Sequence, residues 1–420
     1  MITIEREAIE VDTQTVAARR PSVITVGILT VGVALAATIG VHGAAPWPGL
    51  RAVIALTATA AVVKLARRGG RISSGATVAL GLAGVIVGAG MGPAYLVETG
   101  LSVTSIAGIA ALLSGLAVAG AGTVALTRRA HGWRRLLVVP IVPAVVVLLV
   151  MPLFVAVLVA NAPPFALGDA RPSDLGLAYE DVEMRTTDGV RLLGWYVPSS
   201  NGAAVVLRAG AGSDRTDVLD HAAVLARGGY GVLLLEARGH GGSGGNPNRW
   251  GWYGDRDINA GVTFLQSRDD VVDDRIGVVG MSMGGEEAIG AAGSDKRIRA
   301  VVAEGASGRG IATEGAPSSK ATGWIGHTMA WIGEQATALM SSAPVPTKMR
   351  DAVEASAPRP MLIIIAGDVA EERDAGAHLQ AAAPDSVDLW IVPDTGHTNG
   401  IKTHPDEWAE RVLQFLDRSL

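Results

Sequence analysis

The chain has 420 residues, of which 49% are hydrophobic and 18% are charged, and its formal net charge is −5. This composition is too apolar for an ordinary soluble protein, and the acidic balance gives no reason to expect a nucleic acid as a partner. The chain contains no cysteine, which excludes a disulfide framework and a thiol nucleophile.

The first 160 residues are dominated by long apolar stretches. A helix needs about 20 residues to cross the hydrocarbon core of a bilayer. Four stretches without any charge meet this length: residues 23–41, 75–97, 101–126 and 136–160. A weaker fifth, near 50–63, lies between Arg51 and Lys64, which can snorkel to the membrane surface, so we expect a short span there. The sequence therefore predicts about five spans within residues 22–162. A cleaved signal peptide would explain only the first apolar stretch and would leave a soluble protein, which the later stretches exclude.

The basic residues of the short loops predict the orientation. The loops 64–71 and 128–135 carry four cations each, whereas the turn 98–100 has none and the segment 161–174 has only Arg171. Cytoplasmic loops are enriched in Lys and Arg, so both basic loops and the tail 1–21 are expected in the cytoplasm. The chain after the last span is then extracytoplasmic, with the plasma membrane as the expected location. The cations are Arg19 and Arg20 in the tail, then Lys64, Arg67, Arg68 and Arg71, then Arg128, Arg129, Arg134 and Arg135.

After a linker at 163–176, the pattern changes to short β-branched runs that alternate with amphipathic helical stretches. Residues 177–420 therefore predict an α/β domain with a largely parallel sheet. It begins with a hairpin over 179–199 that turns at Asp188-Gly189. Further strands are expected at 203–210, in a run that begins at Tyr230, in a run that ends at Ser282, and at 298–305. Two more are expected in "PMLIIIAG" and "VDLWIVP". The last helix is expected over 406–416.

The stretch Gly280-Met281-Ser282-Met283-Gly284 fits the G-x-S-x-G nucleophile elbow. Ser282 would sit on a sharp turn between strand and helix, where neighbouring side chains would clash. The backbone N–H of Met283, at the start of the next helix, is the expected first oxyanion donor.

The general base is expected late in the chain, in the order Ser, acid, His. His397, in "VPDTGHTNG" after the last strand, fits this place. Three other histidines fit less well: His221 in a helix, His240 in a glycine-rich loop and His404 at the start of the last helix.

The acid is expected after the strand in "MLIIIAGDVAEER". Asp368 is nearest to the strand end and is favoured, Glu371 is the alternative, and Glu372 ranks third. Any of them would also suit a solvated helix start, where acids are favoured.

With "DGVRLLGWYVP", "LARGGYGVLLLEARGHGGSGG", "DDRIGVVGMSMGG" and "DTGHTNG" in this order, residues 177–420 resemble a bacterial α/β-hydrolase of the serine aminopeptidase-like or dipeptidyl-peptidase-like branch. The resemblance implies an eight-stranded, mostly parallel sheet with a helical cap and a triad of Ser282, His397 and an acid. Many members have His-Gly where this chain has Arg208-Ala209-Gly210, so the second oxyanion N–H is expected from Gly210 or Ala211. Members commonly place the acid where this chain has Ala370, which leaves its position open.

Residues 307–357 lie where such folds carry the cap. A helix there would place Trp324, Thr328, Trp331 and Gln335 along one side. This side is expected to pack on the cap's own core, the alternatives being an acyl pocket or the membrane surface. The sequence has no metal-binding constellation, and "ARGHGGSGG" matches no nucleotide motif, so no cofactor is expected.

These features predict a membrane-anchored serine hydrolase that cleaves an acyl ester, thioester or amide on the extracytoplasmic side. Its expected partners are the lipid bilayer and a small acyl or lipid-like substrate, with a peptide also possible. The alternative is an inactive hydrolase-like sensor or scaffold coupled to the spans. A transporter is disfavoured because the spans carry no charge deep in the bilayer.

Overall fold

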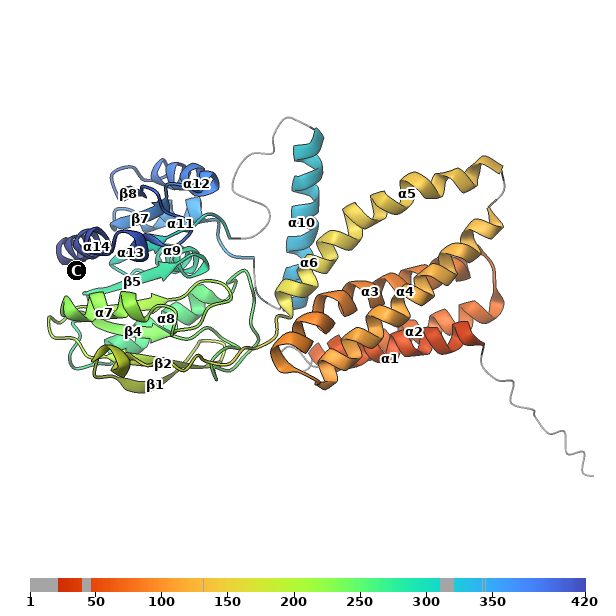
Figure 1. Cartoon of the computed structure of the whole chain (residues 1–420), viewed down its shortest axis with the longest axis horizontal. Helices are drawn as coiled ribbons and strands as arrows, with labels where there is room; N and C mark the ends of the chain where they lie inside the picture. Colours follow the sequence, from red (N-terminus) through yellow and green to blue (C-terminus); the bar gives the residue numbers. More distant parts are fainter. Residues whose placement is uncertain (1–21, 40–46, 131, 310–320, 342, 344) are drawn as a thin grey trace, which may run out of the picture.

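The computed structural model describes residues 22–39, 47–130, 132–309, 321–341, 343 and 345–420. The predicted tail with Arg19 and Arg20 lies outside these ranges, as do the end of the first predicted span and part of the predicted cap. The described chain forms a helical bundle followed by an α/β domain (Figure 1).

Within the described residues, the bundle contains four helices that are long and apolar enough to cross a membrane, together with a shorter apolar helix, α1. The short span predicted near 50–63 is the 22-residue helix α2, with Arg51 in its first turns and Arg67 and Arg68 in its last turn. The last candidate span, Pro140–Ala160, runs through α5, a π-helical turn and α6. The elements are α1 (Val23–Ile39), α2 (Trp47–Arg68), α3 (Arg71–Thr99), α4 (Val103–Arg129), a 3₁₀ turn (Gly132–Leu137), α5 (Val138–Val145), the π turn (Val146–Val150) and α6 (Met151–Ala160).

Small residues bring α3 and α4 into backbone contact. A Cβ on Gly88 would overlap the backbone of Leu112, and a Cβ on Gly115 would lie 2.7 Å from the carbonyl oxygen of Gly81. Such close packing is typical of helix pairs in membranes, where glycine lets two backbones approach.

The α/β domain contains an eight-stranded sheet in the order β1-β2-β4-β3-β5-β6-β7-β8. Strands β1 and β2 form the predicted antiparallel hairpin, and the strands from β4 to β8 are parallel to one another. The strands are β1 (Glu180–Arg185), β2 (Arg191–Val197), β3 (Ala204–Arg208), β4 (Gly231–Leu235), β5 (Ile276–Met281), β6 (Ala300–Glu304), β7 (Met361–Ala366) and β8 (Val387–Val392).

Helices cover both faces of this sheet. One apolar core includes Leu265 of α8, Ile289 of α9, Met349 of α11 and Leu379 of α12, and the opposite core includes Trp408 of α14 and residues of α7. The helices are α7 (Leu219–Arg227), α8 (Gly254–Gln266), α9 (Met283–Ser294), α11 (Met349–Ser356), α12 (Ala370–Gln380), α13 (Gly400–Thr403) and α14 (Pro405–Ser419). This architecture confirms the predicted α/β fold with a mostly parallel, eight-stranded sheet.

The predicted cap segment divides into two parts. Helix α11 packs on α9 and belongs to the core of the domain. Helix α10 (Ala321–Ser341) instead leaves the domain and packs on α6 of the bundle, as Figure 1 shows.

The last candidate span leads directly to the carboxyl edge of the sheet. The amide of Arg249 donates to the carbonyl of Val159 at 3.2 Å, and the ring of Phe165 stacks on His240 with centroids 3.9 Å apart. The amide of Gly168 donates to Asp214 Oδ2 at 2.9 Å. Since Asp214 follows β3 and both His240 and Arg249 follow β4, the bundle joins the edge at which parallel strands end, where ligands of such sheets bind.

Candidate active site

Ser282 stands between β5 and α9 in a strained conformation. Its φ is 51°, which is rare for a residue with a side chain, and its amide donates to the carbonyl of Glu304 at 2.7 Å. The turn is possible because a Cβ on Gly280 would collide with the backbone of Gly284, and a Cβ on Gly284 would lie 2.6 Å from the carbonyl oxygen of Ala209. The local geometry is that of a nucleophile elbow.

His397 contacts the Ser282 hydroxyl. Its Nε2 lies 2.9 Å from Ser282 Oγ, and its Nδ1 lies 2.6 Å from Glu372 Oε1. With the proton on Nδ1, the imidazole donates to the carboxylate and accepts the hydroxyl proton at Nε2, which is the arrangement that a general base requires.

The acid beside His397 is Glu372, and the structure therefore corrects the preference for Asp368 with Glu371 as the alternative. Both of those side chains are exposed, whereas Glu372 is only 1% exposed. The physical reason is the helical turn: α12 begins at Ala370, and the residue that faces inward in its first turn is Glu372. Its second oxygen accepts the amide of Ala366 at 2.8 Å, which anchors the carboxylate to the end of β7.

Buried carboxylates surround the imidazole and favour its charged form. The pKa of His397 is raised above its usual value of 6.5, first by the hydrogen bond to Glu372, against the opposing effect of burial, and further by the charges of Glu372, Glu286 and Glu304. Burial also raises the pKa of Glu286 to about 7, although the amides of Ser307 and Gly308 donate to its carboxylate.

Glu304, at the end of β6, fixes the loop that carries His397. Its Oε1 accepts the amide of Gly400 at 2.8 Å, and its Oε2 accepts the indole N–H of Trp408 at 2.8 Å. The sequence did not single out this residue; the available signal was an acid within the apolar strand run "IRAVVAEG".

A cavity of about 280 Å³ lies in front of Ser282 and His397. Its wall combines apolar groups with the polar side chains of Ser213, Asp217 and Lys402. The predicted oxyanion residues Gly210 and Ala211 line it, and a Cβ on Gly210 would lie 3.0 Å from Ser282 Cβ, so this backbone runs beside the hydroxyl. Met283 is the first residue of α9. An oxyanion hole at these three positions remains the expectation from the elbow motif.

The other three candidate histidines make contacts that do not include the Ser282 hydroxyl. His221 lines the cavity wall but is buried against Trp408, with ring centroids 5.0 Å apart, and burial lowers its pKa to about 4. Burial likewise lowers the pKa of His240 to about 4. His404 contacts the carbonyl of Pro393 through Nε2 at 3.0 Å.

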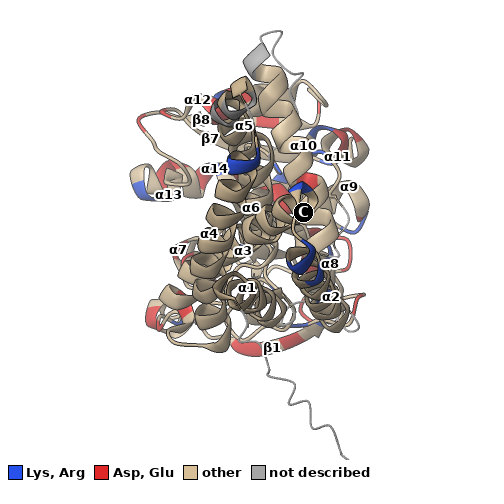
Figure 2. Ribbon diagram, turned by 90° about the vertical axis from the view of Figure 1, so that its right-hand side faces the viewer, with Lys and Arg blue, Asp and Glu red and all other residues tan. Residues whose placement is uncertain are grey.

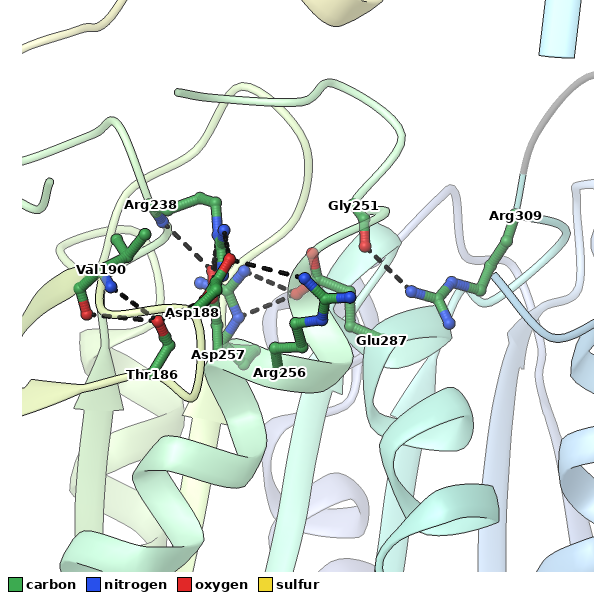
Figure 3. Close-up of polar contacts among 10 residues, drawn as sticks. Thr186, Asp188, Val190, Arg238, Gly251, Arg256, Asp257, Glu287 and Arg309 are labelled. Atoms are coloured by element: carbon green, nitrogen blue, oxygen red, sulfur yellow. Dashed lines mark hydrogen bonds and ion pairs between the residues drawn. The ribbon is translucent and has the colours of Figure 1, made fainter. Parts of the chain in front are cut away.

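Buried ion pairs support the rim of the site (Figure 3). Arg238, in the glycine-rich loop after β4, bridges Asp257 of α8 and Asp188 of the β1–β2 turn. Arg208, in the stretch where many relatives have His-Gly, pairs with Glu287 Oε2 at 2.6 Å. The Arg208 guanidinium is thus held in a buried ion pair, while the backbone of Gly210 lies beside Ser282.

Comparison with known proteins identifies similar chains. Residues 217–420 match the profile described as "Prolyl oligopeptidase family". The esterase Pf2001 of Pyrococcus furiosus is 29% identical, with a TM-score of 0.50 over 62% of this chain and 98% of that one. The uncharacterized protein Rv2307c of Mycobacterium tuberculosis is 37% identical over 27% of this chain, and the thiohydrolase aneE of Aspergillus aculeatus is 36% identical over 30%. The matched segments span 41% and 40% of these two proteins.

Proposed function

Because the C-terminal domain belongs to the α/β-hydrolases, a hydrolase family with esterase and peptidase relatives, we propose that this protein is a membrane-anchored serine hydrolase. It cleaves an acyl ester, thioester or amide. The observation that carries the proposal is the hydrogen-bonded chain from Ser282 through His397 to Glu372 at a strained elbow beside a cavity.

The chemistry follows from this order of groups. Ser282 Oγ attacks the acyl carbonyl carbon while His397 Nε2 takes the hydroxyl proton, and Glu372 holds the resulting imidazolium. The N–H groups of Met283 and of Gly210 or Ala211 stabilise the oxyanion. The imidazolium gives its proton to the departing alcohol, thiol or amine, which leaves an acyl-serine. Water, deprotonated by the same imidazole, then releases the acid and restores the hydroxyl.

The place at which the bundle joins the hydrolase domain favours a particular class of substrate. The last span reaches the domain at the carboxyl edge of the sheet, the same edge at which Ser282 lies. A molecule that partitions into the membrane is therefore close to the catalytic edge, which favours a small acyl or lipid-like ester or thioester. The esterase and thiohydrolase names of two similar proteins agree with such chemistry. The match to the prolyl oligopeptidase profile keeps an amide or peptide bond within the proposal.

We further propose that the hydrolase domain is extracytoplasmic. The two basic loops lie at one end of the bundle, where Arg129 Nη1 donates to the carbonyl of Gly70 at 2.8 Å and Arg71 Nη2 donates to that of Arg129 at 3.2 Å. Figure 2 views the molecule from the end of the bundle that lies away from the hydrolase domain. Cations at this end favour its placement in the cytoplasm.

The decisive experiment uses a fluorophosphonate probe, which reacts with activated serines. The full-length protein in detergent or nanodiscs is expected to be labelled, the Ser282→Ala variant is not, and Ser267→Ala, remote from the site, is labelled like the wild type. Equal labelling of Ser282→Ala would refute the nucleophile. No labelling of the wild type, with no turnover of acyl esters, thioesters or aminoacyl substrates, would instead favour the inactive sensor.

A further inference from the structure

Helix α10 (Ala321–Ser341) is held at the junction between the bundle and the hydrolase domain. Near its C-terminal end, Met340 packs against Ile86, Tyr95 and Val157 of the bundle. The guanidinium of Arg51 donates to the carbonyl of Met340, and the hydroxyl of Tyr253 donates to that of Ser341. The C-terminal end of α10 is therefore bonded both to α2 of the bundle and to the hydrolase domain.

The two sides of α10 differ in the size of their residues. Ala330, Gly333 and Thr337 are buried, and they recur at the spacing of one helical side. Small residues there allow α10 to approach α6 closely. Apart from Met340 near its end, the packed side thus buries small residues rather than the large apolar residues of the helix.

Large apolar residues occupy the opposite side and have no cover among the described residues. Trp324 is 67% exposed, Trp331 is 56% exposed and Leu339 is 83% exposed. Their spacing of seven and eight residues places them on one side of the helix. The prediction that this side packs on the cap's own core is therefore wrong, and none of the described residues that line the cavity at Ser282 comes from α10.

The direction and charge of α10 indicate what covers this side. Figures 1 and 2 both show α10 running across the direction of the bundle helices, and Figure 1 shows it at the end of the bundle that adjoins the hydrolase domain. A helix so placed lies along the membrane surface if the bundle spans it. The segment 321–341 contains no Lys or Arg, and its one acid is Glu334.

We propose that α10 is an interfacial helix that lies in the bilayer leaflet on the hydrolase side, with Trp324, Trp331 and Leu339 at the boundary between headgroups and acyl chains. Tryptophan suits this boundary because its ring is apolar while its N–H can bond to water or a headgroup. Without cations the helix gains nothing from anionic lipid, so its contact with the bilayer is independent of lipid charge. The proposal requires the bundle to be inserted, and it is independent of catalysis.

The absence of native cysteine allows a direct test with single nitroxide labels in the full chain. Gln335→Cys and Leu339→Cys report on the exposed side of α10 and leave both tryptophans in place. Leu113→Cys, 63% exposed in the middle of α4, is the lipid reference, and Val272→Cys, 50% exposed between α8 and β5, is the water reference. In nanodiscs, the measurement is the collision rate of each label with oxygen, which concentrates in lipid, relative to a polar nickel chelate.

The labels on α10 are expected to give an oxygen-to-nickel ratio well above that of Val272→Cys and close to that of Leu113→Cys. The ratio should be the same in phosphatidylcholine and in mixtures with an anionic lipid. A ratio equal to that of Val272→Cys would overturn the proposal, as would labels shielded from both reagents, which would indicate a second copy of the chain on this side. A water-like ratio at Leu113→Cys would instead refute insertion of the bundle.

Discussion

The carboxylate of Glu372 has no freedom to leave His397. One oxygen lies 2.6 Å from the imidazole and the other accepts a backbone amide, and the side chain is almost fully buried. This fixed charge selects the tautomer with Nδ1 protonated and raises the pKa of the ring. Because only the neutral ring can take a proton from Ser282, activity is expected to fall as pH decreases through the raised pKa.

The first prediction concerns Glu372→Gln. The amide no longer fixes the tautomer or stabilises the imidazolium, so kcat should fall by about 10⁴-fold. Since the hydrogen bond to Glu372 is the main cause of the raised pKa, the acidic limb of kcat/KM against pH should move to lower pH in the residual activity. Asp368→Asn and Glu371→Gln are the matched controls and should retain both the rate and the profile. A large loss in either control, with Glu372→Gln active, would assign the acid elsewhere.

The identity of the acid beside His397 could not be predicted from the sequence, whereas Ser282 and His397 could. Ser282 and His397 follow from their positions after two strands, because the topology of the fold brings those loops together. The acid depends on how far the chain runs before α12 begins and on which side of its first turn faces inward. Glu372, Gly376 and Leu379 form the buried side of α12 at helical spacing. That spacing was the available signal, and a count of residues from the strand end missed it.

At the scale of the elements, the β5–α9 elbow depends on backbone contact. A Cβ on Gly284 would lie 2.6 Å and 2.7 Å from the carbonyl oxygens of Ala209 and Arg208, and a backbone cannot move aside as a flexible side chain can. The second prediction is that Gly284→Ala shifts the elbow, destabilises the domain by about 1–3 kcal/mol and lowers the rate of fluorophosphonate labelling.

The matched control for that change is Gly326→Ala in α10, where an added Cβ meets nothing within 4 Å. This substitution should leave the labelling rate unchanged and be neutral or slightly stabilising, because alanine favours helix more than glycine does. Wild-type labelling and stability in Gly284→Ala would contradict the steric account of the elbow.

The third prediction concerns the buried pair between β3 and α9. Both side chains of Arg208 and Glu287 are 2% exposed, so Arg208→Met leaves a buried carboxylate without its partner. The expected cost is about 3–5 kcal/mol, or a decrease of about 6–20 °C in the apparent Tm at a fixed scan rate. Arg191→Met removes a similar pair with Glu183 whose side chains are 46% and 45% exposed, and it should change the Tm little. Equal effects of the two changes would refute the role of burial.

The elements differ in how well the sequence predicted them. The strands and the first hairpin were predicted because apolar runs bounded by glycine and charge are strong local signals. Helix α2 was expected to be a short span, since Arg51 and Lys64 were counted as its limits, yet Arg51 lies within the helix and bonds to the end of α10. The placement of α10 depends on contacts between segments that are far apart in the chain, so a local pattern gave its exposed side but not its location.

At the scale of the whole molecule, the bundle has two chemically different ends. One end carries the cations of the loops at 64–71 and 128–135, joined by the hydrogen bonds of Arg71 and Arg129. The other end carries Glu98, the linker and the hydrolase domain. Translocating a cluster of cations costs more than retaining it, so the second end is expected outside the cell.

The last prediction tests this orientation with single cysteines in intact cells. Val272→Cys in the hydrolase domain and Glu98→Cys at the same end of the bundle should react with a membrane-impermeant maleimide. Trp133→Cys, whose native side chain is 69% exposed in the turn after α4, should react only after the membrane is permeabilised. The reverse pattern would place the hydrolase in the cytoplasm, and reaction of all three in intact cells would show that the bundle does not separate two compartments. Because each label sits on an exposed side chain remote from Ser282, the result is independent of whether the serine is catalytic.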